Sequence, residues 1–214
     1  MRTSFALSLV LSLALTGAAL AQVDASSPKA ALKSLYLAIE QADGTGIQQL
    51  LFVENDPQQD VVKAYTKLIL AGRRLNEVSK QKFPGAAEAK TPGIVSPEDV
   101  AKIDAAAVTV NGDKATVKVS AAADPVNLRQ ISGGWRLVID QGDDATPAHR
   151  ADRIALIQGM TDAINQSADE ISADKYPTIQ DAETVIKQRL GTVPAKVLQS
   201  NPPTSQPATK GAEG

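Results

Sequence analysis

The chain has 214 residues, with 22 basic and 24 acidic side chains and a formal net charge of −2. This near-neutral balance argues against a nucleic-acid partner, because phosphate backbones are bound by concentrated positive charge. The chain contains no cysteine, which excludes disulfides and thiolate metal sites. With a single histidine, a zinc site of ordinary composition is not expected either. We therefore expect no metal and no other cofactor.

The first 21 residues have the pattern of a secretory signal peptide. Arg2 provides the positively charged N-terminal region of such a peptide, and residues 5–15 form its apolar run. Ala19 and Ala21 satisfy the small-x-small rule for cleavage. The run is too short to cross a hydrocarbon core of about 30 Å as a helix. We predict cleavage after Ala21, a mature chain that begins at Gln22, and a periplasmic or secreted protein without stable membrane insertion.

Capping residues and apolar spacing predict several helices in the first half of the mature chain. Ser27 can accept a bond from a free backbone amide, and Pro28 suits the first helical position because it has no N–H to satisfy. Apolar residues then recur at intervals of three and four, as on one face of a helix. The expected segments are a helix over 28–42, a short helix or turn at 47–52, a third helix from a capping box at 56–59 to 83–85, and a brief helix at 96–103.

The apolar period then changes to two, which is typical of strands. Residues 108–119 have the pattern of a hairpin that turns at Asn111 and Gly112, since Asn-Gly favours a two-residue type I′ turn. That register places Val108 opposite Ala115. One face of the hairpin would be apolar and the other exposed to solvent, as expected for a sheet covered on one side by helices.

A second hairpin is predicted over 126–140, with its turn at 133–134. In that register Gln130 lies opposite Leu137, and Trp135 lies on the same apolar face. An amide on such a face must be hydrogen-bonded, hydrated or at the edge of a cavity, because burying it unpaired costs roughly 1–3 kcal/mol.

Two further helices follow. The first begins at Thr146 and Pro147, and the second begins at Thr178 and ends at Gly191. The first carries an apolar stripe that we expect the chain's own sheet to cover, with a partner chain as the alternative, because an apolar stripe is rarely left exposed. The stripe that needs this cover consists of Ile157, Met160, Ile164, Ala168 and Ile171. The tail from Ser200 has almost nothing to bury and is expected to be disordered.

The first-helix pattern, followed by an antiparallel meander with the strand Gly-Gly-Trp-Arg-Leu at 133–137, resembles the NTF2-like superfamily. This resemblance covers residues 27–140 and implies an α+β cone, in which helices pack on a curved antiparallel sheet, with additional C-terminal helices from about 146. The domain would span 22–199, after a signal peptide over 1–21 and before a tail over 200–214. Ketosteroid isomerases and SnoaL-type cyclases belong to this superfamily, as do many exported bacterial proteins without assigned activity.

No set of residues forms a recognisable catalytic site. His149 lies near the start of a helix, where a surface role is favoured over catalysis because a general base needs a positioned partner. Asp140, Asp143 and Asp144 miss the spacing of known calcium loops and are better interpreted as a solvated turn. Ser132 lacks the strand-to-helix setting of a nucleophile elbow and is assigned to a hairpin turn.

Four side chains are candidates for lining a pocket. Core packing is the ordinary interpretation of each, but together they could present polar tips to one cavity on the apolar face of the sheet. They are Tyr36, Tyr65, Gln130 and Trp135.

Three functions fit these observations. The first is a noncatalytic binding or interaction module of the cell envelope, whose partner is a small molecule or an envelope protein. The second is an isomerase or cyclase that uses the cone pocket, and it depends on the resemblance alone. The third is a scaffold whose C-terminal helices mediate oligomerisation, including a possible homodimer.

Overall fold

The computed structural model describes residues 23–54, 56, 59–84, 97–119, 124–140 and 147–200. Within them the fold is α+β, with six helices and a five-stranded mixed sheet that does not close on itself. The predicted signal peptide, the tail after 200 and the turn at 141–146 lie outside the described residues. In chain order the elements are α1 (Pro28–Glu40), α2 (Gly44–Leu50), β1 (Leu51–Val53), α3 (Asp60–Lys82), α4 (Pro97–Ala105), β2 (Ala107–Asn111), β3 (Lys114–Lys118), β4 (Val126–Ile131), β5 (Gly134–Asp140), α5 (Pro147–Ser172) and α6 (Ile179–Ser200).

The sheet has the strand order β1-β5-β4-β3-β2. Strands β2 to β5 form an antiparallel meander, and β1 pairs with β5 in the parallel direction. The sequence indicated only a helix or turn for β1, because three apolar residues carry no usable period. What makes them a strand is their pairing with a segment far along the chain, which places Leu51 beside Leu137.

Both predicted hairpins form, but both registers differ from the prediction by two residues. The first turn consists of Gly112 and Asp113, and Val108 lies opposite Val117. Only Gly112 has a positive φ, which is the pattern of a type II′ turn and not of the predicted type I′. A shift of two residues keeps every side chain on its predicted face.

The second turn consists of Ser132 and Gly133, both with positive φ, and this places Gln130 opposite Trp135. This is the two-residue type I′ geometry, one position earlier than predicted. Ser132 is therefore a hairpin turn residue, as the sequence indicated.

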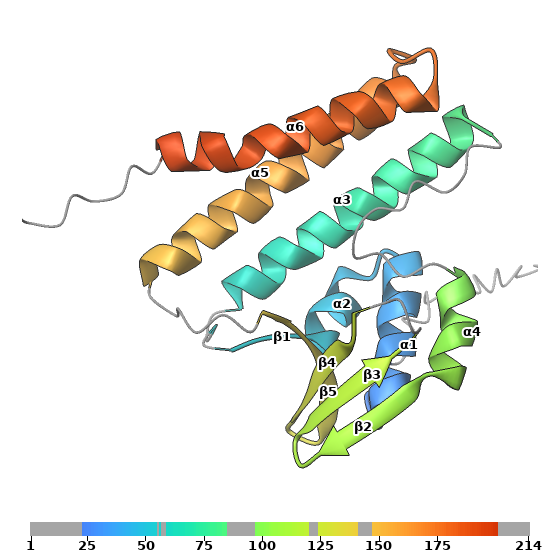
Figure 1. Cartoon of the computed structure of the whole chain (residues 1–214), viewed down its shortest axis with the longest axis vertical. Helices are drawn as coiled ribbons and strands as arrows, with labels where there is room; N and C mark the ends of the chain where they lie inside the picture. Colours follow the sequence, from blue (N-terminus) through green and yellow to red (C-terminus); the bar gives the residue numbers. More distant parts are fainter. Residues whose placement is uncertain are drawn as a thin grey trace, which may run out of the picture.

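Helices α1 and α2 cover one face of the sheet, so that in Figure 1 the uncovered face is turned toward the viewer. The covered face carries the main core, in which Ile47, Leu50, Val117 and Leu128 are at most 2% exposed. We call these two sides the covered face and the open face of the sheet. Since side chains alternate along a strand, Leu137 belongs to the covered face, whereas Arg136 belongs to the open face.

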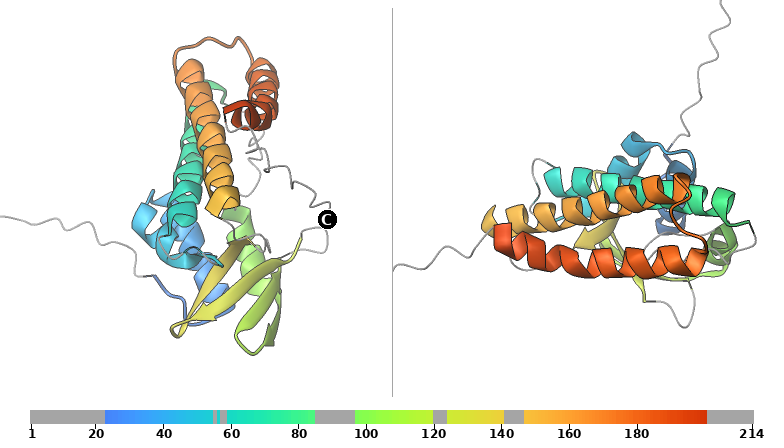
Figure 2. Two further views of the ribbon diagram at one scale, coloured as in Figure 1. Left: turned by 90° about the vertical axis from the view of Figure 1, so that its left-hand side faces the viewer. Right: turned by 90° about the horizontal axis from the view of Figure 1, so that it is seen from above.

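A layer of three long helices, α3, α5 and α6, stands beyond one end of the sheet (Figures 1 and 2). Helix α5 packs against α3 on one side and α6 on the other. The predicted α5 stripe is divided between two clusters. Ile157 joins the main core, whereas Ile164, Ala168 and Ile171 pack with α3 and α6 in a second cluster. Four of the five stripe residues are thus buried within the chain, mainly by neighbouring helices instead of the sheet, whereas Met160 is half-buried outside both clusters.

The caps predicted from the sequence are present at α1 and α6, whereas the capping box predicted at 56–59 is replaced at α3 by a different arrangement, with Gln59 at the N-cap position. Ser27 accepts a hydrogen bond from the Ala30 amide. Thr178 accepts one from the Asp181 amide at the start of α6. The carboxylate of Asp56, only 8% exposed, accepts bonds from the three backbone amides that begin α3, at 3.0, 3.0 and 3.2 Å. None of the described helices is long and apolar enough to span a bilayer.

Candidate functional site

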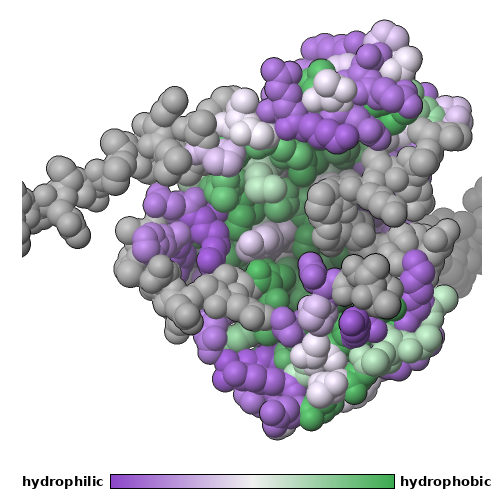
Figure 3. Space-filling view, in the orientation of Figure 1, coloured by the Kyte–Doolittle hydropathy of each residue, from purple (hydrophilic) through white to green (hydrophobic). Residues whose placement is uncertain are grey.

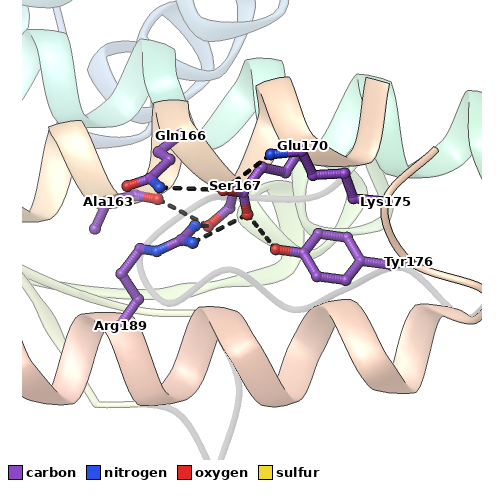
Figure 4. Close-up of polar contacts among 7 residues, drawn as sticks. All are labelled: Ala163, Gln166, Ser167, Glu170, Lys175, Tyr176 and Arg189. Carbon is purple, nitrogen blue, oxygen red and sulfur yellow. Dashed lines mark hydrogen bonds and ion pairs between the residues drawn. The ribbon is translucent and has the colours of Figure 1, made fainter. Parts of the chain in front are cut away.

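A polar cluster joins α5 to α6 and the loop between them (Figure 4). Arg189 of α6 donates to the Ser167 hydroxyl at 2.8 Å and to the Glu170 carboxylate at 3.0 Å. The same carboxylate accepts a short hydrogen bond from the Tyr176 hydroxyl and another from Gln166 at 3.1 Å. The Glu170 side chain is 14% exposed and that of Arg189 is 19% exposed, so the pair is largely shielded from water.

The electrostatics of this cluster fix its protonation states. Hydrogen bonds from Tyr176 and Arg189 lower the pKa of Glu170 to about 2, because they favour the ionised carboxylate. Burial and the neighbouring carboxylate raise the pKa of the Tyr176 phenol above its ordinary value. At neutral pH Glu170 is therefore fully ionised and Tyr176 fully protonated. A general acid or base needs a pKa near the working pH, and neither group has one.

Ser167 in this cluster lacks the surroundings of a nucleophile. It is fully buried, and its hydroxyl donates to the Ala163 carbonyl while accepting from Arg189. A nucleophilic serine needs a base that can take its proton, and here the hydroxyl proton is donated to a backbone carbonyl, which cannot act as that base. The arrangement binds two helices together and does not prepare a reaction.

The open face of the sheet carries a different set of side chains. Phe52 of β1 pairs with Val138 of β5, and both side chains are half-buried. One step further from the helical layer, Arg136 lies directly opposite Arg129. Arg129 is neutralised by Glu54 at 2.6 Å and Asp113 at 3.1 Å, which raise the pKa of its guanidinium.

Arg136 is half-buried, and no hydrogen bond or ion pair joins it to another described residue. Among the residues that the structure describes, Arg136 therefore has no anionic partner, and it lies on the open face next to the neutralised Arg129. Figure 3, in the orientation of Figure 1, shows apolar side chains gathered in a hollow between the helical layer and this face. The open-face strip of Phe52 and Val138 could not be predicted from the sequence, because both residues belong to apolar runs whose open-face members are revealed only by the strand pairing.

The four predicted pocket residues come from four different elements. Trp135 is 5% exposed in the main core, and its backbone amide donates to the Ala25 carbonyl at 2.8 Å. Tyr36 of α1 is 7% exposed, and Tyr65 of α3 is half-buried against the same core. Gln130 lies on the covered face by register, but its side chain is exposed beside the hairpin turn. Register makes only Gln130 and Trp135 direct neighbours.

The remaining candidates have clear positions where the structure describes them. His149 lies exposed in the first turn of α5 and takes part in an interaction there. The aspartates at 143–144 fall outside the described residues. Among the residues that the structure describes, no three His, Cys, Asp or Glu side chains are grouped to hold a metal ion.

The chain matches no protein-family model, no curated protein and no solved structure.

Proposed function

We propose that this protein is an exported, noncatalytic binding module of the bacterial cell envelope, and that it holds a small amphiphilic molecule in the hollow between its helical layer and the open face of its sheet. The observation that carries the proposal is that hollow, with apolar side chains gathered in it. The support for export is the signal-peptide pattern at 1–21.

The side chains on the open face of the sheet define the ligand class that we propose. Phe52 and Val138 offer an apolar strip at the end of the sheet nearest the helices. Arg136, beside that strip, offers a guanidinium that can pair with a carboxylate or a phosphate. Ligand sites of this kind combine a mostly apolar lining with a few placed polar groups. The expected ligand has an apolar body and one anionic group.

A thermal-shift assay with two probes tests the proposal. Dodecanoate should raise the melting temperature of the mature protein, because a ligand that binds only the folded state stabilises it. Dodecanol should raise it less, since it lacks the charge that pairs with Arg136. Replacing Arg136 by Gln should make the two probes equal. If neither probe shifts the melting temperature at concentrations below micelle formation, the hollow is not an amphiphile site.

A pair of matched variants locates the binding. Val138→Thr replaces a methyl group by a hydroxyl on the open face, whereas Val126→Thr makes the same change at a half-buried position on the covered face. Only Val138→Thr should reduce the shift caused by dodecanoate. Equal losses in both variants would indicate a general effect on stability.

An enzyme of the isomerase or cyclase type is the second candidate. Its support is the order of elements, in which helices come first and a four-stranded antiparallel meander follows, as the resemblance to the NTF2-like superfamily implies. In such an enzyme the catalytic pocket would lie on the covered face, near Tyr36 and Trp135. Ligand shifts that respond to Trp135→Phe and not to Val138→Thr would favour this alternative.

A further inference from the structure

Strand β2 forms one edge of the sheet and exposes an apolar side chain there. Its hydrogen-bonding partner is β3 on one side, and no other described strand pairs with it. Val110 is 55% exposed, although its register with the buried Ala115 places it on the covered face. The covering helix α1 packs mainly on β5 and β3, and more than half of the Val110 side chain is left exposed.

This edge lacks the features by which proteins protect edge strands. Residues 107–111 contain no charge and no proline, and their register with β3 is regular, without a bulge. Lysines, prolines and bulges are the usual means of preventing one edge strand from pairing with another. An uncharged edge without a bulge and with an exposed valine is a surface suited to strand addition.

We propose that β2 pairs antiparallel with β2 of a second copy of this chain, on a two-fold axis at Thr109. Thr109 is the middle residue of the strand, so only this register overlaps all five residues of both copies. It places Val108 of each copy opposite Val110 of the other. Because the strands carry no charge, the pairing brings no like charges together.

The two-fold axis is perpendicular to the sheet, so the covered faces of both copies lie on the same side. The result is a continuous sheet of ten strands, in which four valines, two from each copy, cover one another where α1 ends. Such an interface is isologous, with the same patch on both subunits. It is also small, so the association is weak and depends on concentration.

Light scattering after size-exclusion chromatography tests the oligomeric state of the mature protein. From about 10 µM to about 1 mM the mass should rise from that of a monomer toward that of a dimer. Val110→Lys should remain monomeric throughout. Leu37→Lys is the matched control, because Leu37 is 47% exposed on α1 and not on β2. This variant should dimerise like the parent protein. A parent protein that stays monomeric, or a Val110→Lys variant that dimerises, would overturn the proposal.

Disulfide trapping tests the register. The chain has no cysteine, so a disulfide in a single-cysteine variant must join two copies. In the proposed register the two Thr109 side chains lie roughly 5 Å apart, which is close enough for Thr109→Cys to cross-link under mild oxidation. Thr116→Cys, one strand further in, would place its sulfurs roughly 14 Å apart and should not cross-link. Equal cross-linking of both variants would contradict this pairing.

Discussion

Gly159 of α5 lies against Val193 of α6. A Cβ atom on Gly159 would be only 2.7 Å from Val193 Cγ1, which is closer than real side chains approach. The two helices can therefore pack at this spacing only because position 159 has no side chain. The contact complements the Glu170 and Arg189 ion pair, which holds the same two helices together nearer to the loop.

Substituting the two glycines of this helix pair should have opposite effects. Gly159→Ala should lower the free energy of unfolding by about 1–3 kcal/mol, because the added methyl group overpacks the contact with Val193. Gly191→Ala, in α6 with open space around it, should raise stability by up to about 1 kcal/mol through helix propensity. Urea denaturation of both variants measures the difference. A stabilised Gly159→Ala variant would show that α6 can move away without cost.

Acidification should weaken the attachment of α6. The pKa of Glu170 is lowered to about 2 in the folded protein, from an ordinary value of 4.5. A carboxyl group with a lowered pKa stabilises the fold fully above its unfolded pKa, and that stability is lost as the pH falls through the folded value. The loss between pH 4.5 and 2 should amount to at most about 3 kcal/mol.

Stability measured by urea denaturation at a series of pH values tests this expectation. Glu170→Gln should be less stable at pH 7 and should lose less stability between pH 4.5 and 2. Asp162→Asn is the control, because Asp162 is exposed on the same helix and should leave the pH dependence nearly unchanged. Identical slopes in the parent and Glu170→Gln would show that this carboxylate does not contribute.

The start of α3 should depend on Asp56. Its carboxylate accepts three backbone amides, so Asp56→Ala leaves buried donors unpaired and should cost about 1–3 kcal/mol. Asp56→Asn retains one acceptor oxygen and should cost less. Thermal unfolding followed by circular dichroism gives both values. Equal losses would indicate that the shape of the side chain, and not its oxygens, is what α3 requires.

Ile164→Asp should disrupt the helical layer, because Ile164 is 4% exposed between α3 and α6 and an unpaired buried charge costs several kcal/mol. Gln158→Asp introduces the same charge at an exposed position of α5 and should be tolerated. Circular dichroism and size-exclusion chromatography distinguish the two. A folded Ile164→Asp protein that has lost only its self-association would instead support the scaffold hypothesis.

Export should leave a mature chain that starts at Gln22. Expression in a bacterium with an intact secretion pathway, followed by mass measurement of the periplasmic or secreted product, identifies the new terminus. An Ala21→Asp substitution should block cleavage, because the peptidase requires a small residue there. A membrane-bound product that retains Met1 in the parent protein would contradict the prediction.

The sequence predicted those parts of the fold that depend on neighbouring residues. The caps at Ser27 and Thr178 are confirmed, because capping needs only a side chain and the next few amides. The capping box predicted at 56–59 is not formed, because Asp56 reaches past Gln59 to the amides of residues 60–62. The faces of both hairpins are correct as well. The registers were wrong by two residues, because Gly112 can begin one type of turn or end another, and local sequence favours both.

Features that depend on distant pairing could not be predicted. Strand β1 and the open-face strip at Phe52 and Val138 exist only because β1 lies beside β5. The cluster around Glu170 depends on Arg189, which reaches it only after the chain has reversed direction between two helices. The four pocket residues were predicted on the apolar, covered face of the sheet, whereas the hollow adjoins the open face.

The parallel pairing of β1 with β5 also sets an order for folding. Leu51 to Val53 cannot find their partners until residues 137–140 have been synthesised, so the sheet cannot be completed on a partial chain. Contacts between distant parts of a sequence form slowly, because a long loop must close before they bring any gain. Nascent chains that end before β5 should therefore lack a finished core. For the export that we propose, this delay would keep the precursor unfolded long enough to pass through a narrow secretion pore before its sheet is complete.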